Sequence, residues 1–364
     1  MNPNPFLADL AAIAEQVVVL DDYTYQVRSQ RVEVAYQHAY TRWPQPLQHF
    51  GQNSGDAGQV RANLRQQLAG ALYGTYYCPG TTDKAAVPEP PAPLPAPAER
   101  ARTMALLSAA NCTPNGYDPA WMVYAFDGQG NAFVSKNGAL RQLVANQWAF
   151  ANPAETALRV GSLVQLTISK EDTTLQPVFY HVRGTALVSQ QAEFVRVYFN
   201  TTFEGALLLV QGITAAFNEY NLPFLFKCLN HPDLFTRTDS AVLYVSKFDF
   251  HLAYRLLRPL LAQLAPHLRP AVPLFTRPLR PGVSFCEDPA DGQSFGMSRC
   301  ALLAEALFAA YDKQLPPGPA QLAEIERVLT QNGLTSERIY LNANSHLSYP
   351  LPDLTHEPAL AAAH

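Results

Sequence analysis

The stretch Pro273–Cys300, PLFTRPLRPGVSFCEDPADGQSFGMSRC, runs through prolines, an acidic pair and a glycine-containing loop directly into an amphipathic helix. From Arg299 onward, apolar residues recur every three or four positions, which predicts a helix with one buried face. This spacing puts Arg299 in the first turn, beside Gly296. Because a helix N-terminus presents unpaired N–H groups and the positive end of the dipole, the stretch predicts an anion pocket. The alternative is an arginine that only closes the loop over the core.

The composition is that of a globular protein without an extended basic surface. The 364 residues are 48% hydrophobic and 15% charged, which suffices for one large domain or two of ordinary size. A net charge of -4 and the lack of basic runs argue against nucleic-acid binding. Apolar runs fall short of the ~18 residues that cross a bilayer, and the N-terminus lacks a signal-peptide pattern. We therefore expect a cytoplasmic protein that contacts no membrane.

The cysteine and histidine spacings do not match common metal or disulfide patterns. The five cysteines lack CxxC spacing, and the nine histidines form neither HxH nor HExxH. We therefore expect no metal and no cofactor. The motifs GxSxG, GxxxxGK[ST] and GxGxxG are also missing, which argues against hydrolases, P-loop NTPases and dinucleotide-binding enzymes.

The order of helical and strand patterns predicts an α+β fold, with a helical N-terminal part followed by a mixed or antiparallel sheet with flanking helices. We divide the chain into residues 1–78, the helical part; 79–100, a proline-rich loop; 101–354, the α+β part with the candidate site; and 355–364, a flexible tail. The first three are expected to form one integrated domain.

Individual elements follow from local periodicity and turn residues. Strands are predicted at residues 121–126, 131–136, 163–169, 178–183, 193–199, 223–229 and 239–247. Helices are predicted at residues 7–17, 64–72, 203–221, 248–268 and 322–329, the fourth of them interrupted at Pro259.

The strand predicted at residues 193–199 alternates strictly, so Arg196 and Tyr198 share one face. A guanidinium and a phenol then point together toward whatever occupies that side. Arg237 lies further along the chain, with Asp239 as its candidate structural partner.

Lys227 stands between Phe226 and Cys228 in an apolar run, and only six of the 26 basic residues are lysine. Burial and nearby cations both disfavour a charged amine, which is how an enzyme obtains a neutral lysine base near pH 7. The alternative is a lysine on an edge strand whose ammonium group reaches solvent.

Segments spread through most of the chain resemble the HopA-type effector domain family, which is similar to the lyase component of class V lanthipeptide and thioamitide biosynthesis. The matching segments are LRQQLAGALYGTYY, LSAANCTPNGYDPAWMVY, FVRVYFN, FKCLNHPDLFTRTDSAVLYV, the opening stretch and GLTSERIYLN. The resemblance implies a bacterial lyase that eliminates phosphate from phosphoserine or phosphothreonine of a precursor peptide, leaving dehydroalanine or dehydrobutyrine. It also implies a separate kinase-like enzyme as partner, and it makes a secreted effector the alternative to a cytoplasmic enzyme.

The resemblance also implies roles for individual residues. Lys227 would be the base that removes the Cα proton, and Tyr198 would be the general acid, in preference to His231. His231 follows Lys227 by four residues, and its alternative is a turn residue before Pro232. Related phosphothreonine lyases carry a Lys-x-His pair where this chain has Arg196-x-Tyr198, which leaves the identity of the acid open.

The remaining candidates would bind phosphate or support the residues that do. The phosphate-binding residues would be Arg196, Arg237 and Arg299. The supporting residues would be Tyr244, Asp239, Glu287 and Asp288, with the two acidic residues of the opening stretch orienting the arginines. Tyr244 has a core tyrosine as its alternative. A function of another class also fits, namely a non-catalytic effector or phosphopeptide-binding module that uses the same basic pocket.

Overall fold

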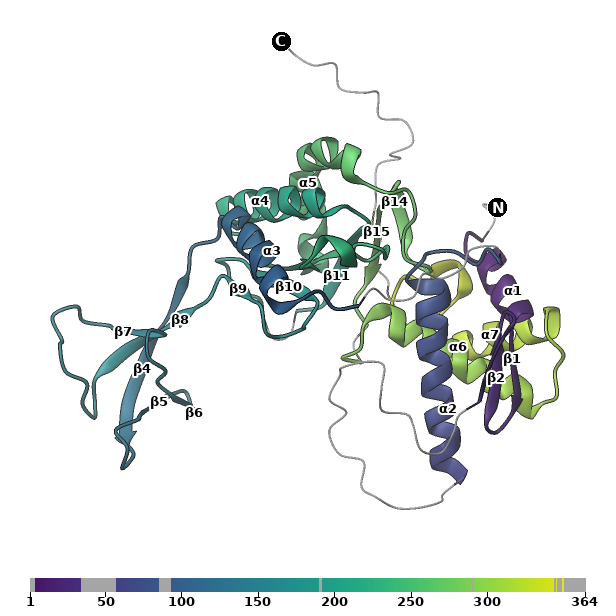
Figure 1. Ribbon diagram of the computed structural model, residues 1–364, viewed down its shortest axis with the longest axis horizontal. Coiled ribbons are helices and arrows are strands. Elements are labelled where there is room, and N and C mark those ends of the chain that lie inside the picture. Colours follow the sequence, from purple (N-terminus) through teal and green to yellow (C-terminus); the bar gives the residue numbers. More distant parts are fainter. Residues whose placement is uncertain are drawn as a thin grey trace, which may run out of the picture.

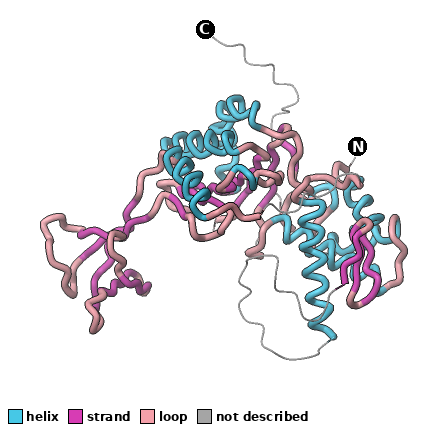
Figure 2. Tube along the Cα trace, in the orientation of Figure 1, coloured by secondary structure: helices cyan, strands magenta, loops and turns pink. Residues whose placement is uncertain are grey.

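The structure is a computed structural model that describes residues 4–33, 57–84, 93–189, 192–289, 291–343, 345 and 349. These residues form three sheets, and helices pack against two of them (Figures 1 and 2). The predicted α+β class is confirmed. The expected tail at residues 355–364 lies outside the described residues, as do residues 85–92 within the expected proline-rich loop.

The central sheet has seven strands in the order β14-β15-β11-β13-β12-β10-β9, and every neighbouring pair is antiparallel. Its strands are β9 (Glu171–Asp172), β10 (Phe179–Arg183), β11 (Phe194–Phe199), β12 (Phe224–Leu229), β13 (Ala241–Ser246), β14 (Arg277–Arg280) and β15 (Val283–Glu287). The helix between β11 and β12 crosses over β13, so two strands that follow each other in the predicted β-α-β passage are not neighbours in the sheet.

The register gives the sheet two unlike faces. Arg196 pairs with Tyr244 and Cys286, whereas Lys227 pairs with His181. Because side chains alternate along a strand, these residues and Tyr198 lie on one face, which we call the front face. The opposite face is apolar and is covered by α4 (Phe203–Glu219) and α5 (Phe250–Leu264). Ring pairs such as Phe217–Phe224 and Phe250–Phe285, with centroids 5.4 and 5.2 Å apart, join these helices to the sheet.

Helices from the N-terminal and C-terminal parts of the described chain pack together into a second helical layer. It contains α1 (Leu7–Gln16), α2 (Ala57–Leu72), α6 (Phe295–Asp312) and α7 (Pro319–Gln331). Three short strands that the sequence analysis missed, β1 (Val17–Asp21), β2 (Thr24–Val27) and β3 (Gln30–Glu33), form a small sheet against α6 and α2. Within the described ranges, every helix is too short or too polar to cross a membrane.

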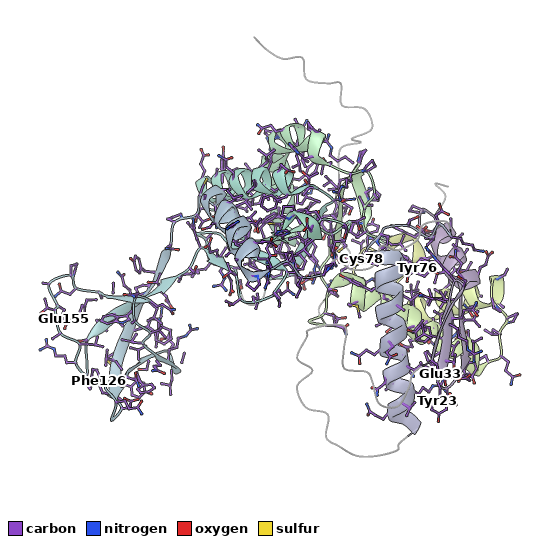
Figure 3. All side chains as sticks on the ribbon, viewed as in Figure 1. Tyr23, Glu33, Tyr76, Cys78, Phe126 and Glu155 are labelled. Carbon is purple, nitrogen blue, oxygen red and sulfur yellow. The ribbon has the colours of Figure 1, made fainter. Side chains whose placement is uncertain are left out.

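Residues 116–168 form a five-stranded lobe with a core of its own, set apart from the rest in Figures 1 and 3. It follows α3 (Pro97–Ala110). Its strands are β4 (Gly116–Phe126), β5 (Ala132–Lys136), β6 (Ala139–Gln142), β7 (Trp148–Phe150) and β8 (Leu163–Ile168). The predicted hairpin of residues 121–126 and 131–136 is confirmed, but it belongs to this lobe and not to the central sheet.

The predicted interruption at Pro259 is wrong, because α5 runs through it. A proline inside a helix removes one backbone hydrogen bond and normally kinks or ends the helix. Here the buried residues Leu257, Leu261 and Leu264 lie on both sides of the proline along one apolar face. Burial of that face holds the helix together across the missing bond.

The helix of the opening stretch begins earlier than its apolar spacing indicates. Ser294 is the N-cap of α6, and its side chain accepts a hydrogen bond from Met297 N at 3.3 Å. Arg299 is therefore the fifth residue of the helix and not part of its first turn. The prediction of an anion site formed by Arg299 at the helix N-terminus is wrong in this respect.

Gly296 lets the ring of Tyr77 pack directly on the first turn of α6. A Cβ at this position would collide with that ring, which is 1% exposed and enclosed by the core. We expect Gly296→Ala to lower the free energy of unfolding by about 1–3 kcal/mol, the usual cost of overpacking a core. Urea denaturation measures this, with Gly128→Ala as control because nothing lies within 4 Å of a Cβ there. Equal losses in the two variants would contradict the packing argument.

Candidate functional site

Arg196 is held on the front face by an aromatic ring and a carboxylate. Its guanidinium carbon lies 5.2 Å from the centre of the Tyr244 ring, its register partner on β13. The same guanidinium forms an ion pair with Asp288 and donates from Nη2 to the carbonyl oxygen of Gln293 at 3.0 Å. Burial raises the pKa of Asp288, and the charge of Arg196 only partly offsets that effect. Asp288 therefore orients this arginine, as expected.

Arg237 belongs to a second charged group, which includes a residue from the N-terminal part of the chain. It pairs through Nε and Nη2 with Asp239 and donates from Nη2 to the Tyr73 hydroxyl at 2.7 Å. Burial alone would raise the pKa of Asp239, but the charge and hydrogen bonds of Arg237, together with the charge of Lys227 and the Tyr73 hydroxyl, outweigh burial and lower that pKa. Tyr73 is placed by η1 (Tyr73–Tyr77), a π-helical turn at the end of α2.

The charge of Lys227 acts on both groups: it contributes to the lowered pKa of Asp239, and it partly opposes the rise that burial causes in the pKa of Asp288. Its side chain is half-buried, with Nζ 4.4 Å from the centre of the Phe179 ring. Nζ donates to Oε1 of Gln176 at 3.1 Å, a neutral partner. Because β12 lies between β13 and β10, the alternative of an edge-strand lysine is wrong.

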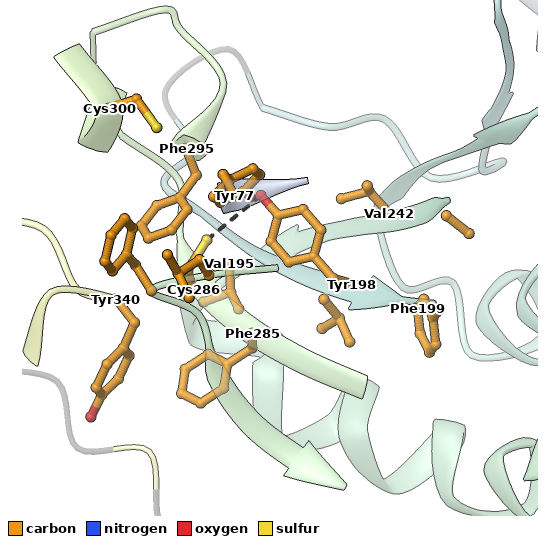
Figure 4. Close-up of a cluster of buried hydrophobic side chains, with 14 of the residues drawn as sticks. Tyr77, Val195, Tyr198, Phe199, Val242, Phe285, Cys286, Phe295, Cys300 and Tyr340 are labelled. Carbon is orange, nitrogen blue, oxygen red and sulfur yellow. Dashed lines mark hydrogen bonds between the residues drawn. The ribbon is translucent and has the colours of Figure 1, made fainter. Parts of the chain in front are cut away.

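Tyr198 shares the front face but is sealed inside an aromatic cluster. It is 3% exposed, and its hydroxyl accepts from the Cys286 thiol at 3.8 Å, with Tyr77 beside it (Figure 4). Burial is the main reason that its pKa rises well above the ordinary value for tyrosine. The hydroxyl of Tyr198, which was predicted to be the general acid, is therefore buried and does not reach the protein surface.

Arg299 does not join Arg196 and Arg237. It is 3% exposed and packs on the Phe295 ring, with 4.8 Å between the guanidinium carbon and the ring centre. Its Nε and Nη2 donate to the carbonyl oxygens of Ile339 and Leu341, both at 2.8 Å. Arg299 therefore has the loop-closing role given above as the alternative, because its guanidinium binds the segment after α7 to α6.

Comparison with known proteins finds a family model that matches part of the chain. Residues 170–341 match the HopA1 effector protein family. We call this part of the chain the HopA1 segment. A search of curated proteins found no match.

Two solved structures of Pseudomonas syringae effector proteins are similar to the chain. The one from pathovar tomato strain DC3000 is 17% identical, with 70% of this chain and 86% of that chain covered and a TM-score of 0.42. The one from pathovar syringae strain 61 is 14% identical, with 77% and 96% covered and a TM-score of 0.41.

The HopA1 segment includes the whole central sheet and every candidate residue named from the sequence. The lobe of β4 to β8 and the N-terminal elements precede it. Tyr73 therefore joins the Arg237 group from outside the HopA1 segment, through the hydrogen bond that its hydroxyl accepts from Arg237.

Two further predicted residues have structural roles elsewhere in the HopA1 segment. Glu287 does not orient an arginine through a hydrogen bond: its carboxylate accepts from Ser345 Oγ, Tyr349 Oη and Asn342 N at 2.6, 2.7 and 2.8 Å. His231 is a turn residue, which was the alternative to a catalytic role. Its Nδ1 accepts a hydrogen bond from Asp233 N at 3.3 Å and caps the short helix η2 (Pro232–Leu234).

The sequence analysis missed three residues beside the predicted ones, namely Tyr73, Gln176 and His181. His181 could have been predicted from the sequence, because the alternation of side chains along its strand places it on the same face as Phe179. Gln176 lies in a loop, and no local pattern marks it. Among the described residues, no group of three or more His, Cys, Asp or Glu side chains is arranged to hold a metal ion.

Proposed function

We propose that the chain eliminates phosphate from phosphoserine or phosphothreonine in a precursor peptide, with Lys227 as the base. The peptide would first be phosphorylated by a separate kinase-like enzyme. The observation that carries the proposal is that Lys227 shares the front face with Arg196, and that its charge acts on the carboxylate partners of both Arg196 and Arg237.

The two arginines are oriented in a way that suits phosphate binding. In the described residues, each uses Nε and Nη2 for its internal hydrogen bonds, to Asp288 and Gln293 in one case and to Asp239 and Tyr73 in the other. Nη1 of each guanidinium makes none of these bonds and would be the donor to a phosphate oxygen. Charge-assisted bonds of this kind are the strong ones, and a fixed guanidinium loses little entropy in forming them.

The elimination itself needs a base and a stabilised leaving group. Lys227 must first lose its own proton to solvent; the Cα–H bond then breaks and its proton goes to the lone pair of the neutral Nζ amine. The electrons of that bond form the Cα=Cβ double bond, and phosphate leaves with the electron pair of the Cβ–O bond. Arg196 and Arg237 would stabilise the charge that develops on the phosphate.

Mass spectrometry of a phosphopeptide incubated with the pure protein tests the proposal. We expect the peptide to lose about 98 Da, because elimination removes one molecule of phosphoric acid from a phosphorylated residue. Retention of the hydroxyl group with release of free phosphate would instead indicate a phosphatase. An unchanged phosphopeptide would contradict the proposed lyase activity.

A phosphopeptide-binding module is the second candidate, and two observations favour it. The predicted acid Tyr198 is sealed in the core, and the two arginines of the candidate site, Arg196 and Arg237, already have carboxylate partners. Binding measured by calorimetry without turnover, even in the presence of the partner kinase, would support this function over the lyase.

A further inference from the structure

His181 lies directly opposite Lys227 on the neighbouring strand. The register of β10 and β12 pairs the two residues, so both side chains lie on the front face. Phe179 belongs to the same group, with its ring 4.4 Å from Lys227 Nζ and 6.3 Å from the His181 ring, centre to centre. An aromatic ring, an ammonium group and an imidazole are thus contiguous at this end of the front face.

The Nε2 atom of His181 is buried and has no hydrogen-bond partner among the described residues. Buried polar atoms are nearly always paired, because leaving one unpaired forfeits its hydration without compensation. The charged groups around the imidazole are Asp172 on β9, Arg183 on β10 and Lys227 on β12. Of these, Lys227 is the donor that the strand register brings opposite the ring.

The imidazole is neutral at neutral pH and therefore offers a lone pair. Its pKa is lowered to about 4, mainly by burial; the charges of Lys227 and Arg183 contribute to this lowering, and Asp172 opposes it. In the tautomer that carries its proton on Nδ1, Nε2 is an acceptor. A neutral imidazole of this kind is a poor proton donor but a good partner for an ammonium group.

Lys227 has donors to spare for such a bond. An ammonium group carries three N–H donors, of which one is used by Gln176 Oε1 at 3.1 Å. The flexible four-carbon stem lets Nζ turn toward the neighbouring strand without a change in the backbone.

We propose that His181 is a positioning residue for Lys227. Its Nε2 accepts a hydrogen bond from Lys227 Nζ, in addition to the one that Nζ donates to Gln176 Oε1. The two neutral acceptors hold the amine at a fixed place on the front face. This inference rests on the proposed function, in which Nζ receives the Cα proton. His181 takes no part in bond breaking and acts by stabilising the ammonium group that the elimination produces.

Titration of the histidine side chains by NMR tests the pairing without any need for activity, with the His181 signal assigned from a His181→Gln spectrum. We expect the pKa of His181 to rise by about one unit in Lys227→Met, because a neighbouring positive charge has been removed. Lys84→Met removes an exposed lysine and should leave the value unchanged. An equal pKa in the wild type and Lys227→Met would overturn the proposal.

Kinetics of two His181 variants test the positioning role. We expect His181→Leu to lower kcat for a phosphopeptide roughly 10- to 100-fold, the effect of losing a hydrogen bond to a charged group, with KM little changed. His181→Gln should restore part of kcat, because its amide oxygen is again an acceptor. His251→Leu, at an exposed histidine of α5, is the matched control and should behave as wild type.

The outcomes separate this inference from the proposed function. If both His181 variants fold but lose kcat equally, the imidazole is only structural and the inference is wrong. If the wild type eliminates no phosphate, the proposed function fails, and the titration still decides whether Lys227 and His181 interact.

Discussion

Lys227→Ala is expected to reduce phosphate elimination by roughly 100- to 10,000-fold, the range for loss of a general base. No other lysine is seen on the front face of the described structure, so a nearby amine cannot replace it. The rate of dehydro-residue formation, followed by mass spectrometry, measures the effect. Lys84→Ala, at an exposed loop position, is the matched control and should retain the wild-type rate.

Lys227→Arg separates the two roles that a positive side chain has at this position. The guanidinium keeps the charge that attracts phosphate, but it does not lose its proton at accessible pH and cannot act as a base. We therefore expect this variant to bind a phosphopeptide with an affinity near that of the wild type while eliminating no phosphate. If Lys227→Ala or Lys227→Arg still eliminated phosphate at the wild-type rate, the assignment of the base would be wrong.

Glu287→Ala is expected to lower the free energy of unfolding by about 3–5 kcal/mol, the cost of removing one partner from a buried charged network. The Glu287 side chain is fully buried, and its carboxylate accepts from the Ser345 and Tyr349 hydroxyls and the Asn342 amide. It also lies 3.5 Å from the ammonium group of Lys247, whose side chain is only 8% exposed. The variant would leave these donors buried without an acceptor.

Urea denaturation at pH 7 measures this loss, and Glu193→Ala is the matched control. Glu193 pairs with the same Lys247 at 2.9 Å, but its side chain is 67% exposed. Exposed ion pairs contribute about 1 kcal/mol or less, so this control should be only slightly destabilised. A loss of similar size in both variants would contradict the importance of the buried network.

The pH dependence of stability provides an independent check on Glu287. Burial alone would raise its pKa, but the hydrogen bonds from Ser345, Asn342 and Tyr349 and the charge of Lys247 together lower it below the ordinary value of 4.5. A carboxylate with a lowered pKa stabilises the fold above its unfolded-state pKa, and this contribution is lost as the pH falls through the folded-state value. The wild type should therefore lose more stability than Glu287→Gln as the pH drops below 4.5.

The candidate site was predictable where it depended on alternation within a strand. That pattern placed Arg196 and Tyr198 on one face correctly, and it identified the strand of Lys227. It gave no information on depth, which is why Tyr198 was predicted as an acid although it is 3% exposed. Depth depends on what packs over the face, and here that is Tyr77, from a turn more than a hundred residues earlier in the chain.

Helix periodicity likewise predicted local structure, but it gave no information on the tertiary contacts of the helix. It predicted the buried stripe of α6, but it did not identify Ser294 as the N-cap, and it gave the loop-closing role of Arg299 only as the alternative to an anion site. The carbonyl oxygens that Arg299 binds belong to residues 339 and 341, at the far side of α7. Such a partner is set by how the connecting helix folds back, which no local spacing records.

The sequence alone determined the α+β class, most of the described α-helices, fewer than half of the described strands, and which side chains share a face of those strands, because these follow from periods of 3.6 and 2 residues. Only the tertiary structure decided the strand order, the separate lobe and the members of the front-face groups. Tyr73 and Arg237, for example, are 164 residues apart and meet through one hydrogen bond. Contacts of this range arise when hydrophobic burial brings distant elements together, and burial is a property of the whole packed chain.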